Sequence, residues 1–482
     1  MAFLIGGANS EVAGYNIENS LRFDGDSYQS RDPSETGITI KGNFSAWVKF
    51  ATSNTEVALF GGFDSSGAND NDGYMVFKRT ADGNLQFEGG DNVYLETTAL
   101  FRDTSAWYHI VLAIDSSNAT ANNKQRIYVN GAEITAFDTR NNLTNLQDLP
   151  MNSTAGNDDR FLVGCDEDTG GRGLFFTGYM ADVYWIDNNS QMAASDFGEY
   201  NDNGVWIPKD GSDISFGDKN SFKMEYGSSG NLGLDSSGLG NSLGDNAGLA
   251  ATNQTTDTPT NNFCTMNPLD VGSDLRDNGS FAEGNLEVTN GATSGQADQQ
   301  RVRGTIAVTK GKWYFEMKQI ANSASIGVLA TEAAHGGTSA NSMLVEYNDG
   351  GEIRFFNGSG RTTKTTGIDS FDDDDIVGCA LDMDNRRAYF HKNGAYQGDP
   401  TPDPAGSPSG AGQFGGIQTG FTMAPCMFDN SSGSAGKGSF NFGNAPFAIS
   451  SGNSDGAGFG NFEYAVPSGY FSLCTKNLAT YG

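Results

Sequence analysis

The feature that most constrains the fold is a pattern that occurs twice. It consists of an apolar strand ending in Asp, a polar turn, a short aromatic strand and an Asn-Gly pair. The first copy spans residues 107–115 and 126–131, and the second spans 376–382 and 387–394. Asn-Gly between strand-like runs predicts a β-hairpin, because both residues tolerate the positive φ of a type I′ turn. The sequence therefore predicts two separate β modules, each built around a similar hairpin.

Strand-like patterns recur along the chain, and no helical periodicity of comparable length competes with them. Phe44, Ala46, Val48 and Phe50 share one face of a single run, which is the pattern of a half-buried strand. The chain combines 65 glycines with 32 Phe and 17 Tyr, which is typical of many turns joining aromatic strands. We expect an all-β chain with two jelly-roll-type β-sandwich domains, joined by a Gly/Ser/Asn-rich linker and flanked by short N- and C-terminal arms.

Composition divides the chain into five parts. Residues 1–19 form an arm with one apolar group, Phe3, Leu4 and Ile5, and this arm is either a frayed terminus or a peptide that docks on a partner. We expect the first sandwich over 20–226, the linker over 227–276, the second sandwich over 277–447 and an aromatic C-terminal segment over 448–482.

Two of these parts leave alternatives open. The linker is low in complexity, but four leucines offer it attachment points on a neighbouring surface: Leu232, Leu234, Leu239 and Leu243. The C-terminal segment is too aromatic for a free tail. We expect it to pack onto a domain or onto a neighbouring subunit.

Charge and cysteine content exclude several classes of function. The chain has 29 basic and 59 acidic side chains, and its net charge of -30 repels nucleic acid and anionic lipid. No stretch approaches the ~20 apolar residues of a membrane span. The first residues lack a basic region and a long apolar run, so we expect no signal peptide. The five cysteines are widely spaced and form no Cys-x-x-Cys, which predicts free thiols in a protein made in a reducing cytoplasm. We expect neither a nucleic-acid partner nor membrane insertion.

Two families resemble parts of this sequence. The first module resembles a laminin G or concanavalin A-like sandwich, through residues 21–25, 44–48, 107–111, 127–131 and 178–183. The second resembles a SPRY domain, through residues 311–316, 326–328, 377–382 and 425–428.

The order of the modules and the bridge over 257–269 are similar to tail-fibre-like proteins of bacteriophages, particularly marine ones. This resemblance implies a virion protein, made in the host bacterial cytoplasm and displayed on the particle exterior. It also implies a homotrimer, an N-terminal arm that contacts other virion proteins, and sandwiches that bind a glycan or protein of the host cell surface.

Candidate catalytic groups are sparse. Glycosidases need two carboxyl groups at a defined separation, and no strand-like run contains the Glu-x-Asp-x-x-Glu string of hydrolases on the lectin-like fold. Residues 372–375 are four consecutive Asp, which predicts a solvated turn. His109 and His391 lie in different modules and are expected to be sheet residues, and His335 lies in a Gly-flanked loop. We expect no catalytic residues.

Calcium is the one cofactor that the resemblance suggests, because laminin G-like sandwiches often carry it at their loop rim. The candidate ligands are Asp64, Asp70 and Asp72 in one loop, and Asp166 with Asp168 in another. Neither loop matches the spaced Asp-x-Asp-x-Asp-Gly calcium motif. The alternative is that these acidic turns only keep the particle soluble.

We therefore expect a non-enzymatic fibre or spike component of a bacteriophage that recognises the host surface. The alternative is a structural protein that decorates the capsid or forms a head fibre. A polysaccharide depolymerase is a third hypothesis, and the missing carboxylate motif disfavours it.

Overall fold

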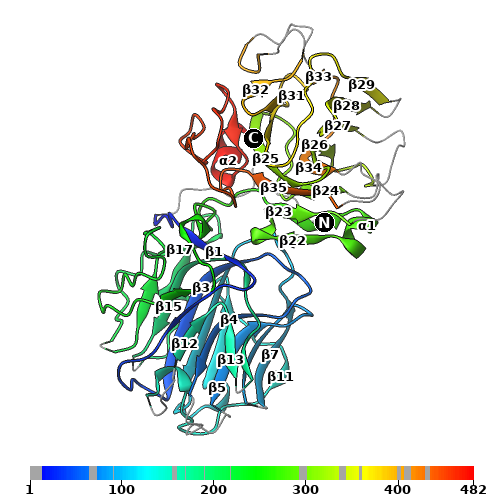
Figure 1. Cartoon of the computed structure of the whole chain (residues 1–482). Helices are drawn as coiled ribbons and strands as arrows, with labels where there is room; N and C mark the ends of the chain where they lie inside the picture. The colour runs from blue at the N-terminus through cyan, green and yellow to red at the C-terminus, as the bar shows by residue number, and fades with distance from the viewer. Residues whose placement is uncertain are drawn as a thin grey trace. The chain divides into compact units, whose positions relative to one another are not determined.

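The computed structural model describes residues 14–64, 73–90, 92–154, 160–168, 170–188, 190–217, 219–291, 301–335, 343–357, 361–398, 403–406, 414–428 and 435–482 (Figure 1). It confirms the predicted all-β class, because strands predominate and both α1 (Ser273–Asn278) and α2 (Thr475–Tyr481) are short. No helix within these ranges is long and apolar enough to cross a membrane. The chain divides into two compact units at Thr260.

The first unit is a sandwich of two antiparallel sheets (Figure 1). Sheet A contains, in spatial order, β10 (Ala132–Glu133), β9 (Gln125–Val129), β8 (Tyr108–Asp115), β3 (Lys41–Phe50), β15 (Thr177–Ile186), β1 (Ser20–Asp24) and β20 (Gln254–Thr255), with β18 (Phe222–Met224) beside β15. Sheet B contains β11 (Phe137–Arg140), β7 (Asn92–Leu100), β6 (Asn84–Gly89), β5 (Tyr74–Arg79), β4 (Val57–Phe63), β12 (Arg160–Val163), β2 (Tyr28–Arg31) and β19 (Gly244–Asn246). Two small hairpins are β13 (Asp166–Asp168) with β14 (Gly171–Gly173), and β16 (Gly198–Tyr200) with β17 (Trp206–Pro208).

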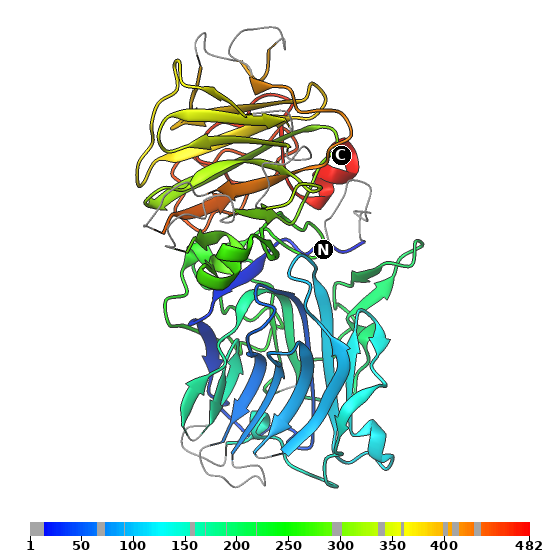
Figure 2. The same ribbon diagram turned by 90° about the vertical axis from the view of Figure 1, so that its right-hand side faces the viewer.

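The second unit is also a two-sheet sandwich, and Figure 2 shows the yellow-green to orange strands of one sheet side by side. Sheet C contains β21 (Met266–Val271), β24 (Arg301–Gly304), β34 (Met423–Phe428), β26 (Ser325–Ala330), β27 (Met343–Asn348), β28 (Glu352–Asn357) and β29 (Arg361–Lys364). Sheet D contains β22 (Ser280–Ala282), β23 (Glu287–Thr289), β35 (Lys437–Asn441), β25 (Lys312–Ala321), β30 (Ile376–Asp382), β31 (Arg387–Lys392) and β32 (Ala395–Tyr396), with β33 (Phe414–Gly415) beside β31 and β36 (Phe471–Ser472) beside β25. Short 3-10 turns are η1 (Ala121–Asn123), η2 (Pro150–Asn152), η3 (Ala194–Asp196), η4 (Ala251–Asn253) and η5 (Glu283–Asn285).

The predicted inward face of β3 lies in the core of the first unit. Phe44, Ala46, Val48 and Phe50 are fully buried. Phe44 stacks on Phe60 of the opposite sheet, with 5.1 Å between the ring centroids. Alternation along the strand therefore predicted correctly which side chains fill the space between the sheets.

The prediction that β3 is half-buried is wrong, because its other face is covered as well. Ser45, Trp47 and Lys49 are only 0, 5 and 1% exposed. Trp47 packs against Ile17, and the Lys49 ammonium lies 2.8 Å from a carboxylate oxygen of Asp257. Segments distant in sequence thus return over the outer face of sheet A.

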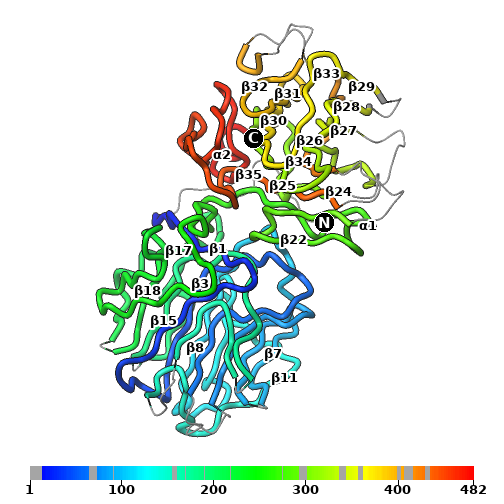
Figure 3. Tube along the Cα trace, viewed as in Figure 1, coloured from blue at the N-terminus to red at the C-terminus, as the bar shows by residue number. Residues whose placement is uncertain are grey.

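The outer face of sheet D is covered in the same way by the C-terminal segment (Figure 3). Glu316 of β25 is fully buried, and it accepts hydrogen bonds from the backbone N–H groups of Glu463 and Tyr464 at 3.0 and 2.8 Å. Phe462 and Tyr470 of the same segment lie in the apolar cluster on this face. Of the two alternatives for the C-terminal aromatics, the structure shows packing onto a domain of the same chain.

Residues 227–276 differ from the expected linker. They supply β19 to sheet B, β20 to sheet A and β21 to sheet C. Leu232 and Leu243 are buried in the first core, whereas Leu234 and Leu239 stay exposed. The segment is ordered both by main-chain pairing, which any residue type can provide, and by side chains such as Asp235, whose carboxylate accepts the N–H groups of Lys223 and Asn241. Its composition therefore did not indicate strands.

Both Asn-Gly corners adopt the predicted turn. The φ angles are 48° at Asn130 and 84° at Gly131, and 48° at Asn393 and 83° at Gly394. Each corner connects two strands with a loop of two residues, since Val129 pairs with Ala132 and Lys392 pairs with Ala395. These values match the positive φ that a type I′ turn requires at both central positions.

The two hairpins also share their polar contacts with neighbouring strands. The Asn130 side-chain oxygen accepts the His109 backbone N–H at 2.8 Å, and the Asn393 oxygen accepts the Ile376 N–H at 2.9 Å. At the other end of each unit, a lysine pairs with the Asp that ends the apolar strand. These pairs are Lys41 with Asp115 at 3.2 Å and Lys312 with Asp382 at 3.3 Å.

We predict that Asp257→Ala lowers the free energy of unfolding of the first unit by about 3 kcal/mol, because it leaves the buried Lys49 ammonium without its carboxylate. Chemical denaturation monitored by tryptophan fluorescence measures this change. The matched control, Asp138→Ala, removes an exposed carboxylate and should change the free energy by less than about 0.5 kcal/mol. A loss below about 1 kcal/mol at Asp257 would show that the Lys49–Asp257 pair contributes little to the stability of the first unit.

Candidate ligand-binding pocket

A pocket of about 360 Å³ opens beside the Asn130-Gly131 corner of the first unit. It lies on the covered outer face of sheet A. Its lining residues come from β9, from the corner itself, from η3 and from the β16–β17 hairpin: Tyr128, Gly131, Ala193, Ala194, Ser195, Gly198, Glu199, Tyr200, Trp206 and Lys209. The first Asn-Gly hairpin therefore forms part of the pocket lining.

Trp206 is the central aromatic group of the pocket. Its ring lies against Gly131 and Gly198, where a Cβ atom on either glycine would overlap the indole. Tyr200 crosses the ring edge-on, with centroids 4.9 Å apart, and donates its hydroxyl hydrogen to the Asn130 carbonyl at 2.9 Å. Tyr200 is 55% exposed, so it presents an aromatic surface to solvent.

A buried histidine fixes the orientation of Trp206. The indole N–H donates to Nδ1 of His109 at 3.1 Å. Since an indole nitrogen can only donate, Nδ1 carries no proton, and the Nε2 hydrogen is directed to the Ser45 hydroxyl oxygen, 2.9 Å away. Burial lowers the pKa of His109 to about 3, so the ring is neutral at physiological pH. His109 was expected to be a sheet residue, and β8 confirms this.

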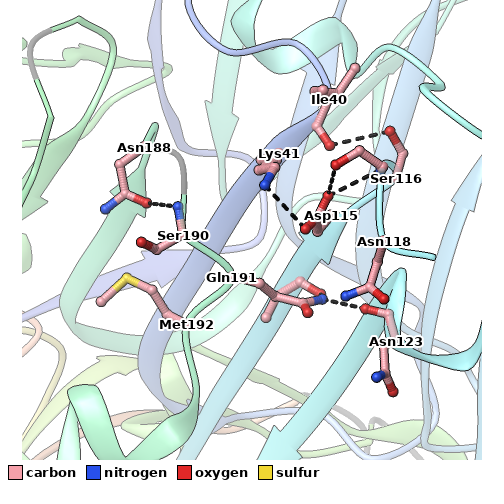
Figure 4. A network of polar contacts seen from close by, with 12 residues as sticks. Ile40, Lys41, Asp115, Ser116, Asn118, Asn123, Asn188, Ser190, Gln191 and Met192 are labelled. Carbon is pink, nitrogen blue, oxygen red and sulfur yellow. Dashed lines mark hydrogen bonds and ion pairs between the residues drawn. The ribbon is translucent and has the colours of Figure 1, made fainter. Parts of the chain in front are cut away.

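Residues 190–192, which directly precede the pocket residues Ala193–Ser195, make polar contacts with the end of sheet A (Figure 4). Gln191 donates from its side chain to the Asn123 carbonyl at 2.6 Å. The Met192 N–H donates to the side-chain oxygen of Asn43 at 2.8 Å, and Asn43 in turn donates to the Ser190 carbonyl at 2.9 Å. These contacts position Ala193, Ala194 and Ser195 before any ligand binds.

Polar groups gather at the mouth of the pocket. Ser195 and Glu199 are exposed, and the Lys209 ammonium donates to the Ser195 carbonyl at 3.1 Å. An aromatic platform with polar groups at its edge suits a pyranose ring, which has an apolar C–H face and hydroxyl groups around its rim. Among the lining residues Glu199 is the one carboxylate, whereas glycoside hydrolysis commonly uses two.

The sequence-predicted site residues lie elsewhere. Asp64 is buried at the end of β4, and its N–H donates to the Gly73 carbonyl at 2.6 Å. Asp166 and Asp168 lie on β13. Asp70 and Asp72 fall outside the described residues, as do Phe3, Leu4 and Ile5 of the docking arm. In the part of the chain that the structure describes, no three His, Cys, Asp or Glu form a group that could hold a metal ion.

The pKa of the Asp166 carboxyl is nevertheless shifted from its usual range. Burial, and then the charge of Asp168, raise the pKa of Asp166 to about 6. The charge effect arises because Asp166 and Asp168, two positions apart on one strand, face the same side. Calcium at this position stays a prediction.

Sequence reasoning did not find the pocket. Tyr128 and Gly131 belong to the hairpin that the first Asn-Gly pair predicts. That pattern indicates a turn between two strands and does not indicate a binding site. Trp206 lies 75 positions after Gly131, on a three-residue strand, and its contact with the corner leaves no local pattern. The available signal was a tyrosine and a tryptophan around a Gly turn, at Tyr200, Gly204 and Trp206.

Comparison with known proteins supports the type of the first sandwich. Residues 25–189 match the concanavalin A-like lectin/glucanases superfamily. This match bears out the predicted laminin G or concanavalin A-like domain. It ends at residue 189, whereas the η3 wall of the pocket begins at Ala193, so much of the pocket lies beyond the matched residues.

Two solved structures are similar to parts of the chain. The SPRY domain of human HERC1 is 21% identical, and the match covers 32% of this chain and 87% of that domain with a TM-score of 0.23. A native heptameric SAP-like pentraxin from Limulus polyphemus is 14% identical, and the match covers 44% of this chain and 94% of the pentraxin with a TM-score of 0.29. No curated protein matches the sequence.

The neutral state of His109 predicts how stability depends on pH. Its folded pKa of about 3 lies below the unfolded value of about 6.5, so the unfolded chain binds the extra proton between these values. The stabilising contribution is therefore complete above about pH 6.5 and is lost as pH falls toward 3. Relative to His109→Gln, wild-type protein should lose about 1.4 kcal/mol per pH unit below about pH 6. Denaturant titrations at several pH values measure this difference, and a difference that stays constant with pH would contradict the assignment.

Proposed function

We propose that this chain is a non-enzymatic glycan-binding protein whose first sandwich holds the sugar against Trp206. The family match supports this proposal, because it relates the first sandwich to lectin-like proteins. The observation that carries it is the pocket itself, with an aromatic ring held in one orientation and polar groups at the mouth. An aromatic platform fixed before binding reduces the entropy cost of association.

We further propose that the protein is a fibre or spike component on the exterior of a bacteriophage virion. The resemblance of the two-module order and of the 257–269 bridge to tail-fibre-like proteins supports this role. The pocket would then recognise a host surface glycan, while the N-terminal arm with Phe3, Leu4 and Ile5 would contact other virion proteins. A homotrimer would present three such pockets.

Trp206→Ala should weaken binding to host envelope polysaccharide by about 30-fold, which corresponds to the roughly 2 kcal/mol typical of a central aromatic contact. Biolayer interferometry on immobilised polysaccharide measures the affinity. Tyr481→Ala, which removes a partly exposed aromatic ring from the other unit, should leave the affinity unchanged. Equal affinities for wild-type protein and Trp206→Ala would exclude the pocket as the binding site.

Immunogold labelling of intact particles tests the location. We expect gold at the tail or at spikes, because a receptor-binding protein must reach the cell surface first. Labelling spread over the whole capsid would instead support the capsid-decorating alternative.

The release of reducing sugar from the same polysaccharide tests for enzyme activity. It should stay at background, and release above background would support depolymerase activity.

A further inference from the structure

We infer that residues 14–18 form a releasable strap on the outer face of sheet A, and that release of this strap loosens the Trp206 ring. Asp182, which lies beneath the strap, makes the release depend on pH. The inference rests on the proposed function, because it names a regulation of the Trp206 site.

The strap and the pocket share one apolar cluster. Ile17 is 3% exposed and packs with Trp47 and Ala181, and the Trp206 ring packs against the same group. The centroid of the His109 ring lies 5.0 Å from that of Trp47 and 5.8 Å from that of Trp206. Side chains in such a cluster hold one another in place. Departure of Ile17 would therefore leave a gap beside Trp47 and weaken the support of the Trp206 ring.

The strap is attached through a small number of side chains. Residues 14–18 lie before β1 and belong to neither sheet. The Ile17 carbonyl accepts the Thr260 hydroxyl hydrogen at 2.9 Å. The Tyr15 hydroxyl donates to a Glu225 oxygen at 3.5 Å and accepts from the Lys223 ammonium at 3.4 Å. Segments outside the strand ladders open at a lower free energy than core strands, so the strap can leave while the sheets stay folded.

Asp182 of β15 meets the strap at a bulge. The register between β15 and β3 shifts between Ala181 and Tyr184, and Asp182 has a φ of 44°. At this bulge Ala181 packs with Ile17, and the Asp182 carboxyl forms a hydrogen bond with the Tyr15 hydroxyl. Asp182 is only 3% exposed. The strap therefore covers an acidic side chain on the outer face of the sheet.

The charges around Asp182 favour its neutral form. Among the described groups that act on Asp182, Lys223 is the one cation, and its ammonium lies 2.6 Å from a Glu225 oxygen. A charged Asp182 would add a second, buried negative charge beside this pair, which is unfavourable. Burial, reinforced by Glu225 and opposed by Lys223 and Tyr15, raises the pKa of Asp182 to about 7.

The other titratable groups facing this site keep their charge state. Hydrogen bonds from Ser212 lower the pKa of the exposed Asp210, whose carbonyl accepts the Lys223 ammonium at 3.2 Å. Burial raises the pKa of three tyrosines and keeps them neutral: Tyr15, Tyr184 and Tyr226.

These contacts give the sign of the pH dependence. Release of the strap admits water to Asp182 and returns its pKa toward the ordinary value of about 4. The seated strap therefore binds a proton more tightly than the released strap. The strap is held most firmly below about pH 4, and its release equilibrium rises by up to about tenfold per pH unit until about pH 7, where it levels off.

Chymotrypsin cleavage after Tyr15 of the full chain measures release, because the protease needs the segment to leave the surface. The product is identified by its new N-terminus at Asn16. The cleavage rate, divided by that of a free peptide of residues 14–20 at the same pH, should rise on the order of tenfold from pH 6 to pH 8.

Two variants assign the effect to Asp182. Asp182→Asn removes the charge but keeps the shape and the positive φ, which Asn tolerates, so its normalised rate should change by less than about twofold. Asp166→Asn removes a carboxyl with a pKa of about 6 on β13 and should keep the wild-type rise. If Asp182→Asn does not fold, the profiles of wild-type protein and Asp166→Asn decide the matter.

Oligosaccharides prepared from host envelope polysaccharide test the link to Trp206. A ligand that needs the seated strap must also slow its release, by the same factor by which release weakens binding. Saturating oligosaccharide should lower the normalised cleavage rate of wild-type protein at pH 8 by at least about threefold, and it should leave the rate of Trp206→Ala unchanged.

A normalised rate that stays constant from pH 6 to pH 8 would overturn the inference, as would an equal rise in Asp182→Asn. Bound oligosaccharide that leaves the cleavage rate unchanged would also overturn it. The proposed function would survive each of these results, because the sugar would still bind in a Trp206-dependent way. If wild-type protein binds no sugar, the glycan site and its regulation fail together. This failure is recognisable because the pH profile of cleavage is measured without sugar.

Discussion

Burial of both faces of a central strand is the constraint on which the rest of this structure depends. β3 in the first unit and β25 in the second each turn one face to the core and the other to a segment that returns from elsewhere in the chain. A covered face removes its polar groups from water, so each group needs a partner inside the protein. Lys49 has Asp257 and Glu316 has two backbone N–H groups. The return segments therefore contribute specific polar contacts as well as apolar cover.

The pocket is a consequence of this arrangement. The return segment over 190–209 lies on the outer face of sheet A and contacts the Asn130-Gly131 corner, where Gly131 leaves room for the Trp206 ring. Trp206 rests on the glycine of the corner, and His109 below accepts its indole hydrogen. The corner thus forms one side of the pocket, and the buried histidine fixes the aromatic ring beside it. Substitutions at His109 would remove the acceptor that holds the Trp206 indole, although His109 itself does not line the pocket.

Local patterns predicted the strands well and the covering contacts poorly. Alternation placed Phe44 and Phe50 in the core, and the Asn-Gly pairs located both hairpins, because these signals arise from neighbours in sequence. The four Asp residues at 372–375 lie in a turn before β30, and the first three are exposed, as the run of charges predicted. In contrast, the partners Lys49 and Asp257 are 208 residues apart, and His109 and Trp206 are 97 apart. Such pairs depend on how segments return through space, and a single sequence contains no record of that path.

The correspondence between the two hairpin units has a practical consequence. Lys41, Asp115 and Asn130 in one unit have counterparts in Lys312, Asp382 and Asn393 in the other, with nearly equal distances. Each molecule therefore contains two hairpins with the same Lys–Asp pair and the same Asn contact, in two different surroundings. A difference in stability loss between matched substitutions in the two hairpins therefore reports the influence of their surroundings, against the same wild-type chain in the same buffer.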